Sequence, residues 1–374
     1  MQKEQNEQDM RKNILASLIL LLASIHASAQ TVILDANDKL PVVGASIFDA
    51  SGTMVGLTLS DGSVPEDLAA ESYPLTIQCI GYNMLTIEKK GQRTLEMTER
   101  SYEIDEVKVT PGDKKVLRLL CYVREYVGIS AFTDTTTIFK EHMVDYLIPV
   151  EKKAKLSSSC DARILTSRIY TRSVDEEKDT VEVSTKGGPS LLFLATIDSS
   201  SVAEPESFKD TDVLPKSYTK TGKYGPICIY RKTQNAFTCF RDGLADEKNH
   251  IMSPAVLKLL GARMDFTQLY KSLSFRMSGS NTYGPADLTS ATFALEAIGM
   301  GKFFKSSNPH KKPVEIKSLM EIYVAKRYYL TTEEAKQIKK NKPEDTKFII
   351  PASAPQLSPS IRNIVKRAQQ QAKD

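Results

Sequence analysis

Thr76-Ile77-Gln78-Cys79-Ile80-Gly81-Tyr82 and the earlier Gly44-Ala45-Ser46-Ile47 are the stretches around which the N-terminal part of this chain is organised. Each places a glycine beside a run of β-forming residues, and glycine in such a run marks a bulge, a bend or a close backbone approach. Dipeptides typical of turns separate the runs: Asn37-Asp38, Ser51-Gly52, Asp61-Gly62 and Lys90-Gly91.

These turns divide the segment Thr31–Pro111 into seven predicted strands, which are Thr31–Leu34, Ala45–Phe48, Thr53–Leu59, Leu75–Ile80, Asn83–Lys89, Arg93–Met97 and Glu106–Thr110. Seven short strands in one short segment predict a small antiparallel sandwich. The ring of Tyr82 is expected to be partly buried, with its hydroxyl at the edge of the sandwich. Asp35, Asn37 and Asp38 lack the glycine and glutamate of a calcium loop, so we interpret them as turn residues.

The order of four motifs in this segment resembles the carboxypeptidase regulatory-like domain family. The motifs are Leu40-Pro41-Val42-Val43-Gly44-Ala45-Ser46-Ile47, Gly56-Leu57-Thr58-Leu59-Ser60-Asp61-Gly62, Ile80-Gly81-Tyr82 and Ile104-Asp105-Glu106-Val107-Lys108-Val109-Thr110. The resemblance implies a transthyretin-like sandwich that serves as an accessory or docking module in Gram-negative envelope proteins. The sequence departs from the family pattern after Asp61-Gly62, because Pro65 has no N–H group to donate to a strand ladder.

Residues 1–29 have the pattern of a secretory signal peptide. Arg11 and Lys12 precede the apolar run Ile14–Ile25, and Ala27-Ser28-Ala29 forms a cleavage site. Translation starts at Met1 or, alternatively, at Met10. The pattern predicts export to the periplasm or outer-membrane periphery of a Gram-negative bacterium, with no transmembrane span in the mature chain.

Composition excludes two classes of protein. The 50 basic and 46 acidic residues nearly balance, so no nucleic-acid partner is expected. The five cysteines are too few for a disulfide scaffold. With residues 1–29 removed, 345 of the 374 residues remain, which is enough for two domains.

Residues 112–345 predict an α+β domain with a curved antiparallel sheet and helices on one face. Apolar residues at three- and four-residue spacing predict helices over Lys114–Val127 and Thr137–Leu147. Extended segments are predicted at Ala162–Arg172, Thr180–Ser184, Leu191–Ile197, Ser272–Ser278, Thr289–Ile298 and Val314–Leu330, with a hairpin at Ile227–Arg241. We expect Val314–Leu330 to bury one continuous face, formed by its even-numbered residues.

The connections follow from turn and cap signals. Ser199–Tyr224 is predicted to be the longest loop, Ser253-Pro254 to open a short helix and Asp265–Tyr270 to form a turn. Thr331 and Glu334 form a capping box that opens another helix. Pro111-Gly112-Asp113 is the expected joint between the two domains. Residues 346–374 are interpreted as a proline-rich linker and basic tail, whose helix Ser358–Lys373 is solvated or, alternatively, lies on a membrane surface.

No catalytic, cofactor or metal site is predicted. His142, His250 and His310 lack a ligand partner at metal-binding spacing, so no zinc carboxypeptidase chemistry is expected. Gly187-Gly188-Pro189-Ser190 is not a nucleophile elbow, and Gly299-Met300-Gly301-Lys302 lacks the spacing of a phosphate loop.

Cys228 and Cys239 form one candidate disulfide. If the hairpin turns at Thr233-Gln234, the two residues lie directly opposite each other, within disulfide reach. Tyr230 and Phe237 would then face each other on the same side. The simpler alternative is two reduced thiols packed against these aromatic rings.

Three functional hypotheses remain open. The first is a non-enzymatic envelope protein that acts in binding or assembly, with a protein of the envelope or outer membrane as its partner. The second is a periplasmic carrier that holds an acyl chain or apolar peptide on the sheet of its second domain. The third is a hydrolase of unrecognised type, which would gather acidic or histidine side chains in one pocket.

Overall fold

The computed structural model describes residues 30–66, 68, 70–100, 114–131, 134–150, 161–175, 180–185, 197, 199–245, 262–301, 312–341 and 346–371. Within these ranges the chain is mostly β, with one ten-stranded antiparallel sheet, three small sheets and two α-helices. Several predictions lie outside the described residues: the leader 1–29, the strand Glu106–Thr110, the joint at 111–113, almost all of the strand Leu191–Ile197, and the helix at Ser253-Pro254.

The N-terminal unit, residues 30–100, contains two small sheets around one core. Strands β2 (Ser46–Phe48), β3 (Met54–Leu57), β4 (Leu75–Gln78) and β5 (Leu85–Ile87) form an antiparallel sheet of order β3-β2-β4-β5, and η1 (Ala70–Ser72) precedes β4. Strands β1 (Val32–Asp35) and β6 (Thr94–Met97) pair in parallel. Six predicted strands are therefore confirmed. The wholly antiparallel arrangement is wrong, because the long connection between β1 and β6 allows them to run in the same direction.

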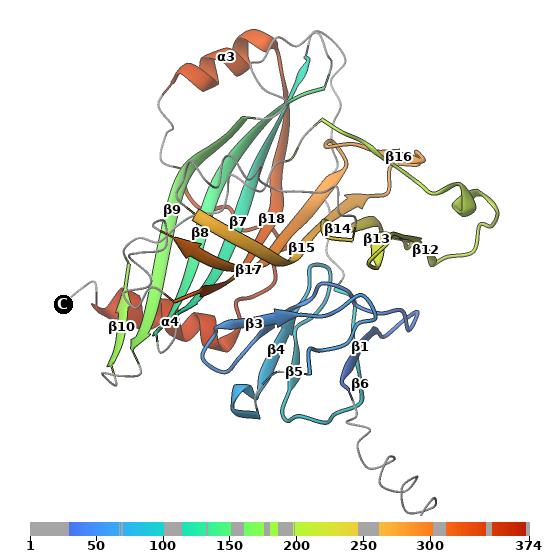
Figure 1. The fold of residues 1–374 in the computed structure, drawn as a ribbon. Coiled ribbons are helices and arrows are strands. Elements are labelled where there is room, and N and C mark those ends of the chain that lie inside the picture. Colours follow the sequence, from blue (N-terminus) through green and yellow to red (C-terminus); the bar gives the residue numbers. More distant parts are fainter. Residues whose placement is uncertain are drawn as a thin grey trace, which may run out of the picture.

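The large sheet occupies most of the remaining chain (Figure 1). Its strands, in spatial order, are β10 (Thr180–Ser184), β9 (Asp161–Asp175), β8 (Asp134–Pro149), β7 (Val116–Ala131), β18 (Val314–Leu330), β17 (Leu288–Gly301), β15 (Ala262–Arg276), β14 (Ala236–Asp242), β13 (Pro226–Lys232) and β12 (Lys216–Thr221). Strands β7 to β10 form one meander and β12 to β18, apart from β16, form another, and the pairing of β18 with β7 joins them. The predicted antiparallel sheet is confirmed.

The predicted helices Lys114–Val127 and Thr137–Leu147 are wrong, because both segments are long strands. Almost every residue of β7 and β8 is buried, whichever face of the sheet it lies on. A strand covered on both sides loses its alternating pattern, and a subset of its apolar residues then falls at helical spacing by chance.

Three smaller predictions in the second domain also need correction. The predicted loop Ser199–Tyr224 contains β11 (Val202–Ala203), η3 (Glu206–Lys209) and β12, and β11 pairs with β16 (Thr282–Tyr283). The predicted turn Asp265–Tyr270 lies inside β15. In β18, a bulge between Val324 and Lys326 shifts the register, so the even-numbered residues change face there.

The two faces of the large sheet have different neighbours. Face 1 carries Tyr122, Arg124 and Tyr126 of β7, and face 2 carries Cys121, Val123 and Glu125. On face 1, Phe48 of the N-terminal unit packs 5.1 Å from Tyr126, measured between ring centroids. The central part of β18 is therefore buried on both sides, not on one as predicted.

The two helices confirm one expectation and correct another. Helix α3 (Thr332–Lys340) begins with the predicted capping box of Thr331 and Glu334. Helix α4 (Pro359–Gln371) is neither a solvated tail nor a membrane-surface helix, because Ile361 and Ile364 are buried in the same cluster as Phe48 and Tyr126. No helix in the described ranges is both long and apolar enough to cross a membrane.

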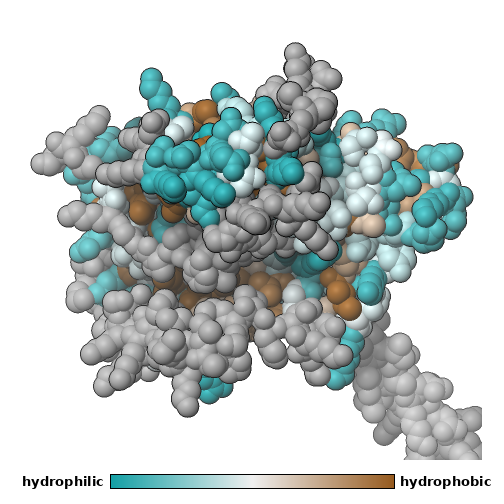
Figure 2. All heavy atoms as spheres, turned by 90° about the horizontal axis from the view of Figure 1, so that it is seen from above, coloured by the Kyte–Doolittle hydropathy of each residue, from teal (hydrophilic) through white to brown (hydrophobic). Residues whose placement is uncertain are grey.

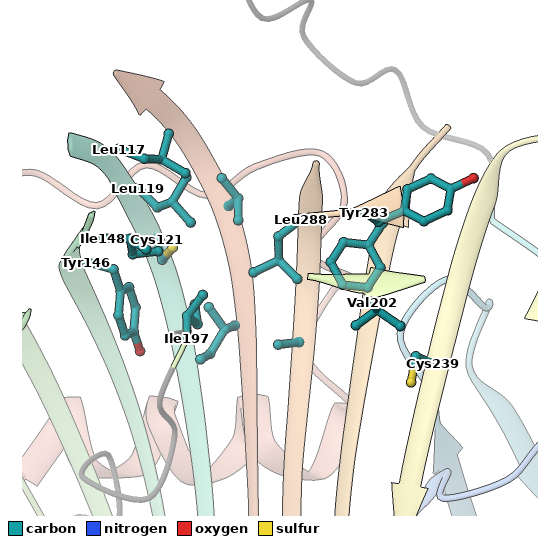
Figure 3. Packing of buried hydrophobic residues seen from close by; sticks show 14 of the residues in the cluster. Leu117, Leu119, Cys121, Tyr146, Ile148, Ile197, Val202, Cys239, Tyr283 and Leu288 are labelled. Carbon is teal, nitrogen blue, oxygen red and sulfur yellow. The ribbon is translucent and has the colours of Figure 1, made fainter. Parts of the chain in front are cut away.

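Face 2 bears a broad apolar cluster that extends over most strands of the sheet. Figure 3 shows Leu117, Leu119 and Cys121 of β7 beside Tyr146 and Ile148 of β8, and Tyr283 farther along the same cluster. Seen from above in Figure 2, hydrophobic residues lie deeper than the hydrophilic residues that surround them. The large sheet thus has this apolar cluster on face 2 and the cluster of Phe48 and Tyr126 on face 1, and it forms the centre of the fold.

Candidate functional site

Face 1 carries a patch of short hydroxyl side chains where β14, β15 and β17 run side by side. In one row Thr238 lies opposite Ser274, which lies opposite Ser290, and in the next row Ser272 lies opposite Thr292. These five residues are called the hydroxyl floor below. Because their side chains are short, they leave a depression in the face that the longer side chains around it do not fill.

The N-terminal unit covers this depression and encloses a cavity of about 450 Å³. Much of its contribution comes from the two stretches that stand out in the sequence, including Gly44 and Ser46 of the first and Gln78 to Tyr82 of the second, and Glu99 and Arg100 add to it. The floor comes from the large sheet. The cavity therefore exists only because the two parts of the chain pack against each other, and cavities between domains are common ligand sites.

Two glycines shape the N-terminal wall of the cavity. Gly44 has a φ of +68°, and a Cβ atom added there would lie 2.8 Å from Cε2 of Phe240 on the large sheet. Gly44 thus allows the close approach of the two units. Gly81, with a φ of +87°, has no atom within 4 Å of its added Cβ position. Gly81 therefore lies at the open rim of the cavity.

Arg231 of β13 joins the two units at the rim through an ion cluster. Its Nη2 atom lies 2.8 Å from Oδ2 of Asp35 and 2.5 Å from Oδ2 of Asp38. The hydroxyl of Tyr82 donates to Oδ2 of Asp35 at 2.8 Å and also accepts from Arg231. Asp35 keeps its expected turn role as well, because its Oδ1 accepts from the N–H of Asn37.

The acidic residues of this cluster have shifted pKa values. Burial raises the pKa of Asp35, but hydrogen bonds from Arg231 and Tyr82 outweigh burial and lower the pKa overall. Burial, together with the charge of Asp35, raises the pKa of Glu99, whose Oε1 lies 3.7 Å from Arg231. The single guanidinium thus faces three carboxyl groups, and the pKa of Glu99 is raised while that of Asp35 is lowered.

We expect Glu99→Gln to stabilise the protein at neutral pH by less than about 1 kcal/mol, a small gain because Glu99 is partly exposed. Ionised Glu99 opposes folding above its raised folded-state pKa, and this penalty vanishes below its ordinary value of 4.5. Urea unfolding at pH 7 and pH 4.5 should show a gain that is smaller at the lower pH. Asp35 does not interfere, since its stabilisation is lost only below its ordinary value of 3.8. An equal gain at both values would contradict the assignment.

The inner end of the cavity holds a second polar group. Nε2 of Gln78 donates to both carboxylate oxygens of Glu321, at 2.8 and 2.9 Å, across the contact between the two units. Burial raises the pKa of Glu321, opposed by the charge of Arg124 and the hydrogen bond from Gln78. Arg124 lies opposite Glu321 in the sheet and donates from Nη2 to the carbonyl oxygen of Pro355 at 2.7 Å.

One hydroxyl of the floor is left without a hydrogen bond. Ser290 is fully buried and lines the cavity, and its Oγ has no hydrogen-bond partner among the described residues. Buried polar groups are normally paired, and an unpaired one costs about 1–3 kcal/mol. An oxygen of this kind is a natural contact for a ligand.

Face 2 contains a buried group of ionisable side chains that the sequence did not reveal. Glu125, Lys140 and His142 are 0, 1 and 2% exposed. Oε2 of Glu125 lies 3.7 Å from Nζ of Lys140 and 3.5 Å from Nε2 of His142. Burial lowers the pKa of Lys140. Since β8 was predicted to be a helix, this cross-strand contact could not be foreseen.

Cys228 and Cys239 come together in the predicted hairpin, but in a different register. Cys239 lies opposite Tyr230, and Cys228 lies opposite Arg241, so the two cysteines are diagonal neighbours and not directly opposed. The turn is two residues longer than predicted, which shifts every pair. Their Sγ atoms are 3.3 Å apart and unbonded, and a hydrogen bond from Cys239 lowers the pKa of Cys228 to about 6. The disulfide stays a prediction.

Exported protein is expected to contain this disulfide if the compartment is oxidising, because the two sulfurs need only a small shift to bond and one thiol ionises easily. Alkylation under denaturing conditions, with and without reductant, followed by mass spectrometry of the peptides, measures the two states. The matched control is Cys121, which is buried on face 2 and should be alkylated in both samples. Full alkylation of Cys228 and Cys239 without reductant would leave the reduced pair as the correct interpretation.

The remaining candidates from the sequence lie apart from the cavity. His142 lies in β8 on face 2, and Gly299 to Gly301 form the end of β17. His250, His310 and Gly187 to Ser190 lie outside the described residues. The sequence missed the hydroxyl floor, although one signal was present: Ser272 and Ser274, like Ser290 and Thr292, alternate with other residues at the two-residue period of a strand.

Comparison with known proteins does not identify the chain. No protein-family pattern matches it. No curated protein matches its sequence. A solved structure titled "Lipid-protein interactions in lipovitellin" matches with a TM-score of 0.27 and 11% identity, over 59% of this chain and 26% of that chain. This chain thus spans about a quarter of that protein's length, and a likeness this weak supports no conclusion about fold or function.

Proposed function

We propose that this protein is an exported, non-enzymatic binding protein that holds a small molecule between its N-terminal unit and its large sheet. The cavity over the hydroxyl floor is the observation that carries the proposal. Its volume of about 450 Å³ falls in the range typical of small-molecule sites. Both units contribute side chains, so binding would also strengthen their association.

The chemistry of the cavity favours binding over catalysis. A serine nucleophile needs a neighbouring base, and Ser290 has no such partner among the described residues. The carboxylate nearest the floor, Glu321, is held by Gln78. Neither group is set up to move a proton to or from a ligand.

The cellular setting of the proposal rests on the sequence. The leader pattern of residues 1–29 supports export, and the resemblance to the carboxypeptidase regulatory-like family supports a place in a Gram-negative envelope. In this setting a second envelope protein would receive or deliver the ligand, in line with the partner expected from the sequence.

The proposal is tested by ligand-observed NMR with the purified chain and three probe classes: neutral mono- and disaccharides, dodecanoate, and apolar dipeptides. Ser274→Phe fills the cavity, and Thr219→Phe on the exposed strand β12 is the matched control. At least one class should bind the wild type and the control but not Ser274→Phe. If Ser274→Phe does not fold, Thr238→Leu replaces it. The proposal is rejected if no class binds, or if binding survives in the filled variant.

A carrier of an acyl chain is the second candidate, favoured by the apolar cluster on face 2 (Figure 3). The cluster extends across enough strands to contact an acyl chain along its length. Its described residues, however, pack against one another, and the cavity lies on the opposite face over hydroxyl groups. The dodecanoate probe separates this candidate from the first.

A further inference from the structure

We propose that the ligand of this cavity is a neutral, polyhydroxylated molecule, of which a saccharide unit is the simplest class. The inference rests on the proposed function and adds the chemistry of the ligand. It follows from three features of the cavity: the hydroxyl floor, the state of the charges around it, and the aromatic pair beside it.

The hydroxyl floor matches a ligand that both donates and accepts hydrogen bonds. Each serine or threonine hydroxyl can do both, and its hydrogen rotates to suit the partner. The rows of the floor follow the register of three adjacent strands, so the spacing of the oxygens is set by the backbone. Ligand hydroxyls have the same dual character and would pair with the floor, including Oγ of Ser290.

Among the described residues, four charged side chains line the cavity, and each already has a contact within the protein. Glu99 lies 3.7 Å from Arg231, and Arg100 donates to the carbonyl oxygen of Ala352 at 3.0 Å. Arg231 is held by Asp35 and Asp38, and Glu321 is held by Gln78. An ionic ligand would have to leave water and displace one of these contacts to gain a counter-charge, which is costly. The ligand expected here is therefore uncharged.

A wholly apolar ligand fits the cavity no better. It would keep water from the floor and leave its hydroxyls, Ser290 among them, buried without a hydrogen-bond partner. Apolar surface is nevertheless present at one side, where the rings of Phe240 and Tyr270 lie 5.0 Å apart between centroids. Sugar rings combine these needs, since they present hydroxyls at the edge and C–H groups on the faces.

The decisive variant is Thr292→Val, which removes one floor hydroxyl and keeps the shape of the side chain. Titration calorimetry with the saccharide that binds most tightly should show about tenfold weaker binding, as expected for the loss of one buried hydrogen bond. Dodecanoate should not bind the wild type. Thr219→Val, the same change on the exposed strand β12, should leave saccharide binding unchanged.

Each alternative result has a defined meaning. If dodecanoate binds and Ser274→Phe abolishes that binding while saccharides do not bind, the inference fails and the proposed function stands. If no probe binds the wild type, the proposed function fails as well. If Thr219→Val weakens saccharide binding as much as Thr292→Val does, the saccharide binds elsewhere and the inference is overturned.

Discussion

Replacing Arg124 with methionine should lower the free energy of unfolding by about 3–5 kcal/mol, the range found when one partner of a buried ionic group is removed. Arg124 is 2% exposed and lies between Glu321 of β18 and Glu141 of β8 in the sheet register. Its Nε donates to the hydroxyl of Tyr122 at 3.1 Å, and that hydroxyl contacts Glu141. Without the guanidinium, both carboxylates would stay buried with no neighbouring positive charge from β7.

Urea unfolding measures this loss, and two further variants interpret it. Arg263→Met removes an arginine whose side chain is 69% exposed, and it should change stability by no more than about 0.5 kcal/mol. Adding Glu321→Gln to Arg124→Met should recover at least about 1 kcal/mol, because one buried charge disappears. If Arg124→Met costs no more than Arg263→Met, the network does not have the role assigned to it.

Arg231→Met should cost about 3 kcal/mol and should act on the contact between the two units. The side chain of Arg231 is largely buried, and the carboxyl groups of Asp35 and Asp38 are almost fully so. Its loss would leave these groups and Glu99 to repel one another. Urea unfolding gives the stability, and the rate of limited proteolysis within residues 30–100 reports whether the N-terminal unit separates first.

The control for this variant is Lys39→Met, which removes an exposed ion pair with Glu96 from the same N-terminal unit and should cost less than about 1 kcal/mol. Arg231→Lys keeps the charge but loses the paired donors of the guanidinium, so its loss should be intermediate. A loss in Arg231→Met no greater than in Lys39→Met would show that the ion cluster does not hold the two units together.

The sequence predicted those elements that are bounded by turn or cap signals or that alternate between buried and exposed residues near their ends. The hairpin of β13 and β14, the strand β18 and the capping box of α3 all fall where local signals placed them. The central strands β7 and β8 did not, because the N-terminal unit and α4 cover face 1 and an apolar cluster covers face 2. Burial on both sides depends on segments far away in the chain, and no local pattern records it.

The residues of the candidate site also divide into those that the sequence indicated and those that it did not. Gly44 and Gly81 stood out in the sequence because glycine in a strand pattern signals unusual backbone geometry, and both line the cavity. The floor under them was missed. Ser272, Ser274 and Ser290 are ordinary strand residues until the register of three strands brings them together.

By itself, the sequence determined where the N-terminal unit lies, where most strands of both parts run, and which turns and caps bound them, because these depend on neighbouring residues. Tertiary structure alone decided that Arg231 meets Asp35 and that Gln78 meets Glu321, over separations of 196 and 243 residues. Such contacts depend on which surfaces bury together, and this is a property of the whole chain.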